Sequence, residues 1–201
     1  MRINATPLIA ALTLFVAGCS KSESFDLGEV KNGTYHNQFF GLTVSLPHDW
    51  KVADREFLRK FNEERTKRMA GRDKEIAGAE LLFVTKYPIG AAVPVNPSIT
   101  CFASNTEDTP YKSGEEYLED IMKSFQGGST NFKVVQKPTR QSIAGRQAGA
   151  MEIDLLGGST TLHQLYLMVP IKGYAVGFLA TYERDDDGTI DHALQSIKFE
   201  E

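Results

Sequence analysis

Apolar and polar residues alternate along several segments of this 201-residue chain, and a period of two predicts β-strands. Leu42, Val44 and Leu46 are separated by single polar residues, and Pro47 then ends the run. Two further strands flank a Pro-rich loop, and three more follow near the C-terminus, where short Gly-containing connections predict an antiparallel meander. These five predicted strands occupy residues 79–88, 97–105, 147–156, 160–169 and 174–182.

Apolar residues at helical spacing predict two amphipathic helices between the strands. The first runs from Asp54, a suitable N-cap, to Gly71, and i,i+4 Glu–Lys and Glu–Arg pairs cover its polar side. The second begins at Ser113, where Glu116 completes a capping box, and ends at Gly127. Their inner faces carry Phe57, Leu58, Phe61 and Met69 in the first helix and Tyr117, Ile121 and Phe125 in the second.

The meander is apolar on both faces, which predicts a sheet covered on both sides. A short helix and a final strand close the chain within residues 185–201. The order of elements predicts the α+β class, with an antiparallel sheet covered by helices in an α/β/α sandwich. One face is expected to carry Met151, Ile153, Leu155, Leu165, Leu167, Val169, Val176 and Phe178.

Two segments at the ends of the predicted domain carry a family resemblance. FGLTVSLPHDW (residues 40–50) and ALQSIKF (residues 193–199) resemble the PsbP-like superfamily, which includes the DcrB-like bacterial lipoproteins. The likeness spans about residues 34–199, the size of one domain. It implies an α/β/α sandwich on an antiparallel sheet and a non-enzymatic role in binding or assembly. The resemblance assigns no functional site residues to this chain.

The first nineteen residues have the three parts of a secretory signal. Arg2 supplies positive charge, and residues 7–17 form an apolar run too short for the ~20 residues of a membrane-spanning helix. Residues 16–19, Val-Ala-Gly-Cys, resemble the bacterial lipobox, which implies cleavage before Cys19 and lipidation of its thiol. The alternative is an ordinary signal peptide followed by an unrelated cysteine.

This interpretation divides the chain into a signal peptide (residues 1–18), a lipidated Cys19 with a polar tether (residues 19–33) and one domain (residues 34–201). Two or three acyl chains anchor a protein durably, whereas one chain holds it weakly. Ser20 follows the lipidated cysteine, and resemblance to Gram-negative lipoproteins implies sorting to the outer membrane. We therefore expect a protein of the bacterial cell envelope that faces the periplasm.

Charge and cysteine content exclude other classes. Removal of residues 1–18 takes away one cation, Arg2, and changes the formal net charge from −4 to −5. The basic segment at residues 65–74 contains Asp73 and follows Glu63 and Glu64, so we expect no nucleic-acid binding. Cys101 is left without a cysteine partner, and its place within a strand predicts a buried core residue.

His163 is the one candidate for acid–base chemistry. If the Gly157-Gly158-Ser159 connection is a three-residue loop, Ile153 lies opposite His163. We favour this register because it places both residues on the apolar face that carries Leu165 and Leu167. A loop of two or four residues instead brings Glu152 or Asp154 opposite the imidazole and makes an acid–base or metal pair. The simpler alternative is a histidine at a strand end near solvent.

The remaining candidates are weaker signals. Asp185, Asp186 and Asp187 lack the spacing of a calcium loop and predict favourable charges at a helix N-terminus. The sequence lacks the G-x-S-x-G, Walker, HExxH, CxxC and dinucleotide-binding motifs, and we expect no enzyme, no cofactor and no metal. Trp50 is read as a lid over the core or as a surface platform.

The connection at residues 87–97 is unusually apolar and is our predicted interaction surface. Its candidate binding residues are Ile89, Val93 and Val95, with Trp50 as a further candidate. The first hypothesis is a lipid-anchored domain that binds or helps to assemble another envelope protein. The second is a carrier of a small apolar or lipidic ligand between sheet and helix. The third is an enzyme that uses His163 with Glu152 or Asp154.

Overall fold

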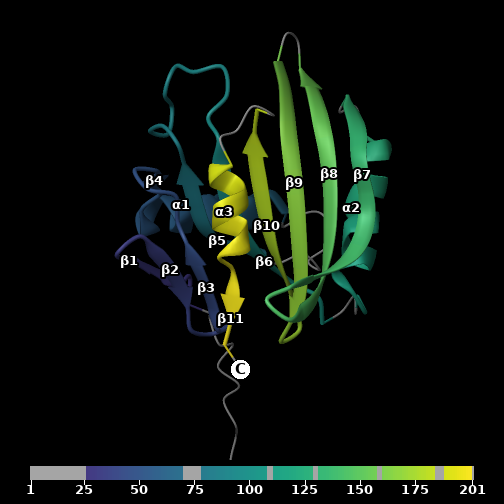
Figure 1. Cartoon of the computed structure of the whole chain (residues 1–201), viewed down its shortest axis with the longest axis horizontal. Coiled ribbons are helices and arrows are strands. Elements are labelled where there is room, and N and C mark those ends of the chain that lie inside the picture. The colour runs from purple at the N-terminus through teal and green to yellow at the C-terminus, as the bar shows by residue number, and fades with distance from the viewer. Residues whose placement is uncertain are drawn as a thin grey trace, which may run out of the picture.

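The computed structural model describes residues 26–69, 78–107, 111–128, 131–157, 160–183 and 188–200. In this part of the chain the larger sheet contains β4 (Lys51–Val52), β5 (Gly78–Thr85), β6 (Ser98–Asn105), β7 (Phe132–Ile143), β8 (Arg146–Gly157), β9 (Thr160–Ile171) and β10 (Tyr174–Tyr182). Its order is β4-β5-β6-β10-β9-β8-β7, and its neighbours are antiparallel (Figure 1). A smaller sheet has the order β1-β2-β3-β11, from β1 (Glu29–Lys31), β2 (Thr34–Asn37), β3 (Leu42–Ser45) and β11 (Lys198–Phe199).

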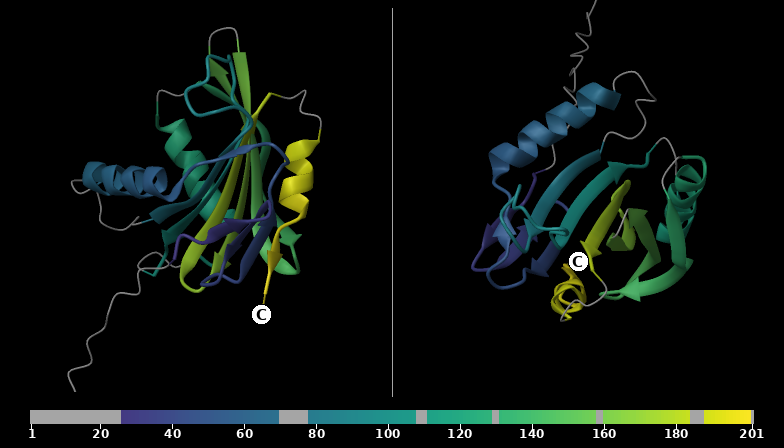
Figure 2. Two further views of the ribbon diagram at one scale, coloured as in Figure 1. Left: turned by 90° about the vertical axis from the view of Figure 1, so that its left-hand side faces the viewer. Right: turned by 90° about the horizontal axis from the view of Figure 1, so that it is seen from above.

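Both faces of the larger sheet are covered, as the sequence predicts. Helices α1 (Arg55–Met69) and α2 (Gly114–Gln126) lie on one face, and α3 (Thr189–Gln195) lies on the other (Figure 2). The smaller sheet shares that second face, because side chains of β2 and β3 join those of β5, β6 and β10 in one core. The α+β prediction is confirmed, with a second sheet contributing much of one outer layer.

The predicted strands β5 and β6 and the meander β8–β10 are present, whereas β7 is missing from the sequence interpretation. β7 lies at the edge of the larger sheet and pairs only with β8 among the described strands. Pro138 and several charged residues interrupt its apolar pattern, and the pairing register shifts between Gln136 and Thr139. An edge strand tolerates proline and charge because one side of its backbone needs no partner strand.

The register of the β8–β9 hairpin differs from the predicted one. Gly157 pairs with Thr160, so two residues separate the strands instead of three. A shift of one residue moves every side chain of a strand to the opposite face of the sheet. Ile153 and Met151 therefore pack with α2, on the face opposite to Leu165 and Leu167. Our expectation of one shared face for these residues is wrong.

Both long helices begin at the predicted caps. The Asp54 carboxylate accepts a hydrogen bond from the backbone N–H of Phe57 at 2.7 Å. The Ser113 hydroxyl accepts from the N–H of Glu116 at 3.2 Å, and the Glu116 carboxylate accepts from the N–H of Lys112 at 2.8 Å. These bonds satisfy donors that the first helical turn leaves unpaired. Gly71, the predicted end of the first helix, lies outside the described residues.

The folded domain begins before residue 34, the predicted boundary. β1 lies inside the segment 19–33, and the Tyr35 hydroxyl donates to the carbonyl of Leu27 at 2.9 Å. The Asn37 amide donates to the carbonyl of Asp26 at 2.8 Å. Residues 26–33 thus belong to the domain instead of the tether.

The predicted signal peptide and Cys19 lie outside the described residues. No helix within the described residues is long and apolar enough to cross a bilayer.

Candidate ligand-binding groove

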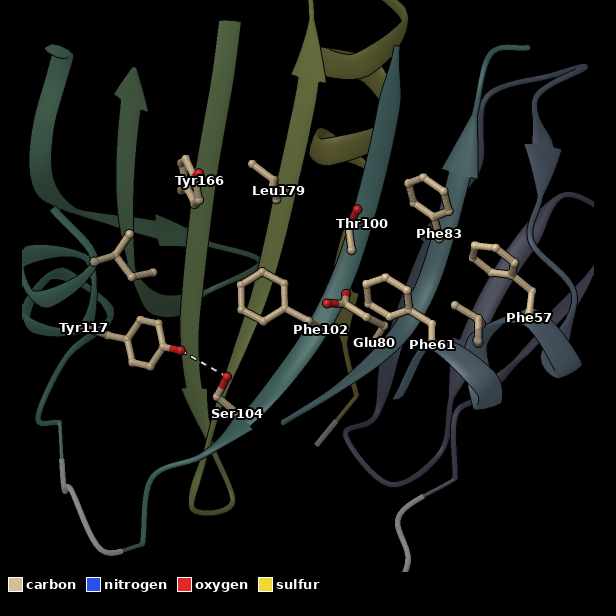
Figure 3. Close-up of a pocket in the computed structure, with 12 residues that line it drawn as sticks. Phe57, Phe61, Glu80, Phe83, Thr100, Phe102, Ser104, Tyr117, Tyr166 and Leu179 are labelled. Atoms are coloured by element: carbon tan, nitrogen blue, oxygen red, sulfur yellow. Dashed lines mark hydrogen bonds between the residues drawn. The ribbon is translucent and has the colours of Figure 1, made fainter. Parts of the chain in front are cut away.

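Helices α1 and α2 cover the same face of the larger sheet at a distance from each other, and a groove lies between them (Figure 3). Its volume is about 360 Å³. The floor comes from β5, β6, β9 and β10, whose side chains on this face point outward between the helices. Aromatic and aliphatic side chains dominate the lining, which comprises Phe57, Leu58, Phe61, Glu80, Phe83, Thr100, Phe102, Ser104, Tyr117, Ile121, Tyr166 and Leu179.

The α1 wall is held to the sheet at a few points. Leu58 is buried, and the Asn62 side chain donates to the carbonyl of Glu80 at 3.0 Å and accepts from its N–H at 2.8 Å. Phe57 and Phe61 remain 36% and 48% exposed. The Phe57 ring stacks on Phe61 and on Phe83, with centroids 6.4 and 6.2 Å apart. The wall is therefore an aromatic surface that faces both groove and solvent.

The α2 wall is fixed more firmly. Leu118 and Met122 enter the core beneath this helix, so Tyr117 and Ile121 are held at the edge of the groove. The Tyr117 hydroxyl donates to the Ser104 hydroxyl at 3.0 Å (Figure 3). The floor depends on Gly177, because a Cβ there would overlap the ring of Phe102. The groove thus has one wall anchored in the core and one exposed aromatic wall.

Only a few polar groups reach the groove, and apart from the Tyr117 hydroxyl on α2 they lie on the sheet. Glu80, Thr100 and Ser104 supply a carboxylate and two hydroxyls, while the Tyr166 hydroxyl donates to the Gln164 side chain at 2.7 Å. Burial raises the pKa of the Tyr166 hydroxyl well above its ordinary value, so this phenol stays protonated. Ligand pockets of ~300–1,000 Å³ commonly combine apolar walls with a few polar groups. The arrangement suits an apolar ligand with a small polar end.

His163 lies on the opposite face of the sheet from this groove. The two-residue connection places it beside Asp154, whose carboxylate lies 2.9 Å from Nδ1, and the Glu152 carboxylate lies 3.3 Å from Nε2. The imidazole is 4% exposed and meets the Tyr182 ring edge-on at 5.0 Å. The prediction of Ile153 opposite His163 is wrong, as is that of a solvent-facing histidine.

This cluster does not have the form of an acid–base site. Each ring nitrogen faces a carboxylate oxygen, so neither nitrogen of the imidazole is directed at a substrate. A doubly protonated ring can donate to both carboxylates at once. The cluster satisfies buried charges, and its half-exposed member is Glu152.

The other predicted residues occupy varied positions. Cys101 is fully buried, as expected, and burial raises the pKa of its thiol well above the ordinary value. Trp50 packs against the larger core, as a lid would. In the 87–97 loop Ile89 is 50% exposed, Val93 is half-buried and Val95 is 9% exposed. Val95 therefore supports the loop from within, and a binding role for Ile89 stays a prediction.

The groove was not located from sequence. The sequence predicts Phe57 and Phe61 on the apolar side of one helix, and Tyr117 and Ile121 on the apolar side of another. The other residues that line the groove with them lie mostly on four different strands. The clearest overlooked signal is the exposed pair of phenylalanines, because a helix that used its whole apolar side for the core would bury both rings. Among the described residues, no group of three or more His, Cys, Asp or Glu side chains is arranged to hold a metal ion.

Comparison with solved structures found several similar chains. Cyanobacterial PsbP (CyanoP) from Synechocystis sp. PCC 6803 superposes with a TM-score of 0.54 and 13% identity, covering 86% of this chain and 96% of that one. LpqN, involved in cell envelope biogenesis of Mycobacterium tuberculosis, gives 0.48 and 10%, covering 80% and 83%. A Pseudomonas aeruginosa protein of unknown function gives 0.40 and 14%, covering 62% and 83%. No family model matches the sequence, and no curated protein matches it.

The similarity to CyanoP confirms the PsbP-like fold that the sequence motifs predict. It covers nearly the whole of that protein, so the likeness concerns a complete domain. At this identity it establishes the arrangement of the chain alone, and the function has to be argued from the groove.

Proposed function

We propose that this protein is a non-enzymatic domain of the bacterial cell envelope that carries a small apolar or lipidic ligand in the α1–α2 groove. The observation that carries the proposal is the groove itself, with six aromatic rings around a volume of about 360 Å³. Each Å² of apolar surface removed from water contributes ~25 cal/mol, so the half-exposed rings gain when an apolar ligand covers them. The structure favours this hypothesis over the enzyme, which would need an accessible base.

The location belongs to the same proposal and rests on the sequence. The lipobox resemblance at residues 16–19 implies a lipid anchor on Cys19 in the outer membrane, with the domain facing the periplasm. Asp26 already contacts the domain through its carbonyl, so only the few residues after Cys19 connect the domain to the proposed anchor. A chain segment spans at most ~3.6 Å per residue, which keeps the groove close to the bilayer.

Filling the groove should abolish ligand binding. Thr100 lies on its floor and is half-buried, so Thr100→Trp places an indole where the ligand would bind. We expect the affinity for a fluorescent fatty acid, cis-parinaric acid, to fall about tenfold or more, which corresponds to ~1.4 kcal/mol per factor of ten. Fluorescence titration of the domain without its signal peptide measures the change.

Thr161→Trp is the matched control, because Thr161 is exposed on β9 outside the groove. Its affinity should equal that of the unmodified domain. Equal binding by both variants, or failure of the unmodified domain to bind any fatty acid probe, would refute a carrier function for this groove.

The anchor predicts a chemical modification. Cells supplied with labelled palmitate should label the full-length protein, whereas Cys19→Ser should remain unlabelled and move to the soluble fraction. Gel fluorography after immunoprecipitation reads both proteins side by side. Label on the Cys19→Ser variant would show that the lipobox interpretation is wrong.

A second function, binding of an envelope protein, is favoured by the loop at residues 87–97. Ile89 and Tyr87 are 50% and 41% exposed, although Asn96 holds the loop in place through hydrogen bonds with both backbone groups of Tyr87 at 2.9 and 3.0 Å. An ordered loop that exposes large apolar side chains is typical of an interaction surface.

Ile89→Asp tests this second function. A charge at the centre of an apolar contact should reduce recovery of a crosslinked envelope protein about tenfold, the loss typical of an interface hot spot. Leu156→Asp is the control, since Leu156 is 41% exposed at the end of β8, which β9 and β10 separate from β6 in the sheet. Undiminished recovery with Ile89→Asp would remove the loop from consideration.

A further inference from the structure

Three phenylalanine rings on the α1 side of the groove form a stack that is open to solvent. The ring planes of Phe57 and Phe61 are 18° from parallel with centroids 6.4 Å apart, and those of Phe57 and Phe83 are 15° from parallel with centroids 6.2 Å apart. Phe61 and Phe57 are 48% and 36% exposed. We call Phe61, Phe57 and Phe83 the aromatic row. Because its planes are nearly parallel, a flat ring in the groove can extend the stack, whereas a flexible chain gains only from the area that it covers.

The floor beside the aromatic row has one hydroxyl within an apolar ladder. The pairing of β5 with β6, of β6 with β10 and of β10 with β9 aligns four groove residues across the sheet, in the order Phe83, Thr100, Leu179 and Tyr166 (Figure 3). Directly paired side chains on one face of a sheet have Cβ atoms ~5 Å apart. The Thr100 hydroxyl is therefore the polar group next to the Phe83 end of the aromatic row.

Thr100 is also the hydroxyl that is available to a ligand. The Tyr166 hydroxyl donates to the Gln164 side chain at 2.7 Å, and the Tyr117 hydroxyl donates to the Ser104 hydroxyl at 3.0 Å. Among the described residues, none forms a hydrogen bond with the side chain of Thr100. A threonine hydroxyl both donates and accepts, so it can bind one oxygen of a ligand.

We propose that the groove binds a flat conjugated ring that carries an oxygen and an apolar tail, the chemistry of an alkylated phenol or quinone. The ring lies parallel to the aromatic row, its oxygen bonds to the Thr100 hydroxyl, and the tail covers Leu179 and Ile121. This inference rests on the carrier function proposed above and names the class of ligand that the groove prefers.

A matched pair of probes, 4-octylphenol and trans-4-octylcyclohexanol, tests the preference for a flat ring. The two compounds share the tail and the hydroxyl and differ in whether the ring is planar. Displacement of cis-parinaric acid from the domain without its signal peptide, followed by fluorescence, gives both dissociation constants. We expect the constant for the phenol to be about three- to tenfold lower, the range that an aromatic pair contributes beyond the area it buries.

Three variants assign the preference to the residues that we propose. Phe57→Leu combined with Phe61→Leu keeps two half-exposed apolar side chains but removes their rings, and it should bring the two constants together. Phe199→Leu is the control, because Phe199 lies on β11 in the smaller sheet and does not line the groove, so the preference should persist. Thr100→Val removes the hydroxyl and should raise both constants about threefold, the effect of one lost hydrogen bond.

The outcomes separate this inference from the carrier function. Equal constants for the two probes in the unmodified domain, or displacement by neither probe, would overturn the inference and leave the carrier function standing if cis-parinaric acid still binds. Failure to bind cis-parinaric acid would overturn both. A preference that the double leucine variant retains would contradict the placement of the ring, and unchanged constants in Thr100→Val would contradict the placement of its oxygen.

Discussion

Replacement of Gly114 with alanine is expected to lower the free energy of unfolding by about 3 kcal/mol, at the upper end of overpacking costs. Gly114 is the first residue of α2, and a Cβ there would overlap the carbonyl oxygen of Met168 and the backbone of Gly149. These are backbone atoms of β9 and β8, which cannot turn aside as a side chain can. The helix would have to move away from the sheet, and Leu118 and Met122 would lose core contacts. Urea denaturation measures the loss.

Gly127→Ala is the control for this experiment, because Gly127 has φ of −81° and the nearest atom to an added Cβ is 3.6 Å away. It should leave the unfolding midpoint nearly unchanged. Because Tyr117 and Ile121 form one wall of the groove, Gly114→Ala should also weaken fatty acid binding. Wild-type stability of Gly114→Ala would contradict the backbone contact between α2 and the sheet.

Replacement of His163 with leucine is expected to lower the free energy of unfolding by about 1.5–3 kcal/mol, the contribution of a hydrogen bond to a charged group. Asp154 would lose the ring nitrogen that lies 2.9 Å from its carboxylate, in a position only 6% exposed. Glu152 would lose its contact with Nε2 but can turn toward solvent, so Asp154 accounts for most of the cost. Urea denaturation at neutral pH gives the difference in free energy.

Lys60→Ala removes an exposed ion pair of 2.7 Å with Glu56 and should change stability little, since surface pairs contribute little. His163→Leu lies on the face opposite to the groove, so the folded fraction should bind fatty acid normally. A loss of stability no larger than that of Lys60→Ala would show that His163 does not hold the buried carboxylates.

Local patterns predicted much of the fold because they depend on neighbouring residues. Ser113 and Glu116 identified the start of α2, and alternation identified the meander. The register between β8 and β9 changes when the connecting loop is one residue longer or shorter. Counting the apolar residues on each face favours a three-residue loop, whereas the structure has a two-residue loop. Glu152 and Asp154 share a face of the sheet with His163, which contacts both carboxylates, and a count of apolar residues does not include such polar contacts.

The groove could not be predicted in the same way. It depends on the distance between α1 and α2, which are separated by two strands and a long loop, and on how far Phe57 and Phe61 remain from the core. Tertiary packing sets both quantities. β7 was missed for a related reason, because its place at an edge allows Pro138 and charges that a central strand would exclude.

Native mass spectrometry of the protein extracted gently from its own membrane tests the carrier function most directly. We expect an added mass of roughly a few hundred daltons beyond the anchor, the size of ligand that fits such a pocket. This mass should be absent from Thr100→Trp and retained in Thr161→Trp. An unmodified protein with no added mass, or an adduct that Thr100→Trp retains in full, would contradict the account.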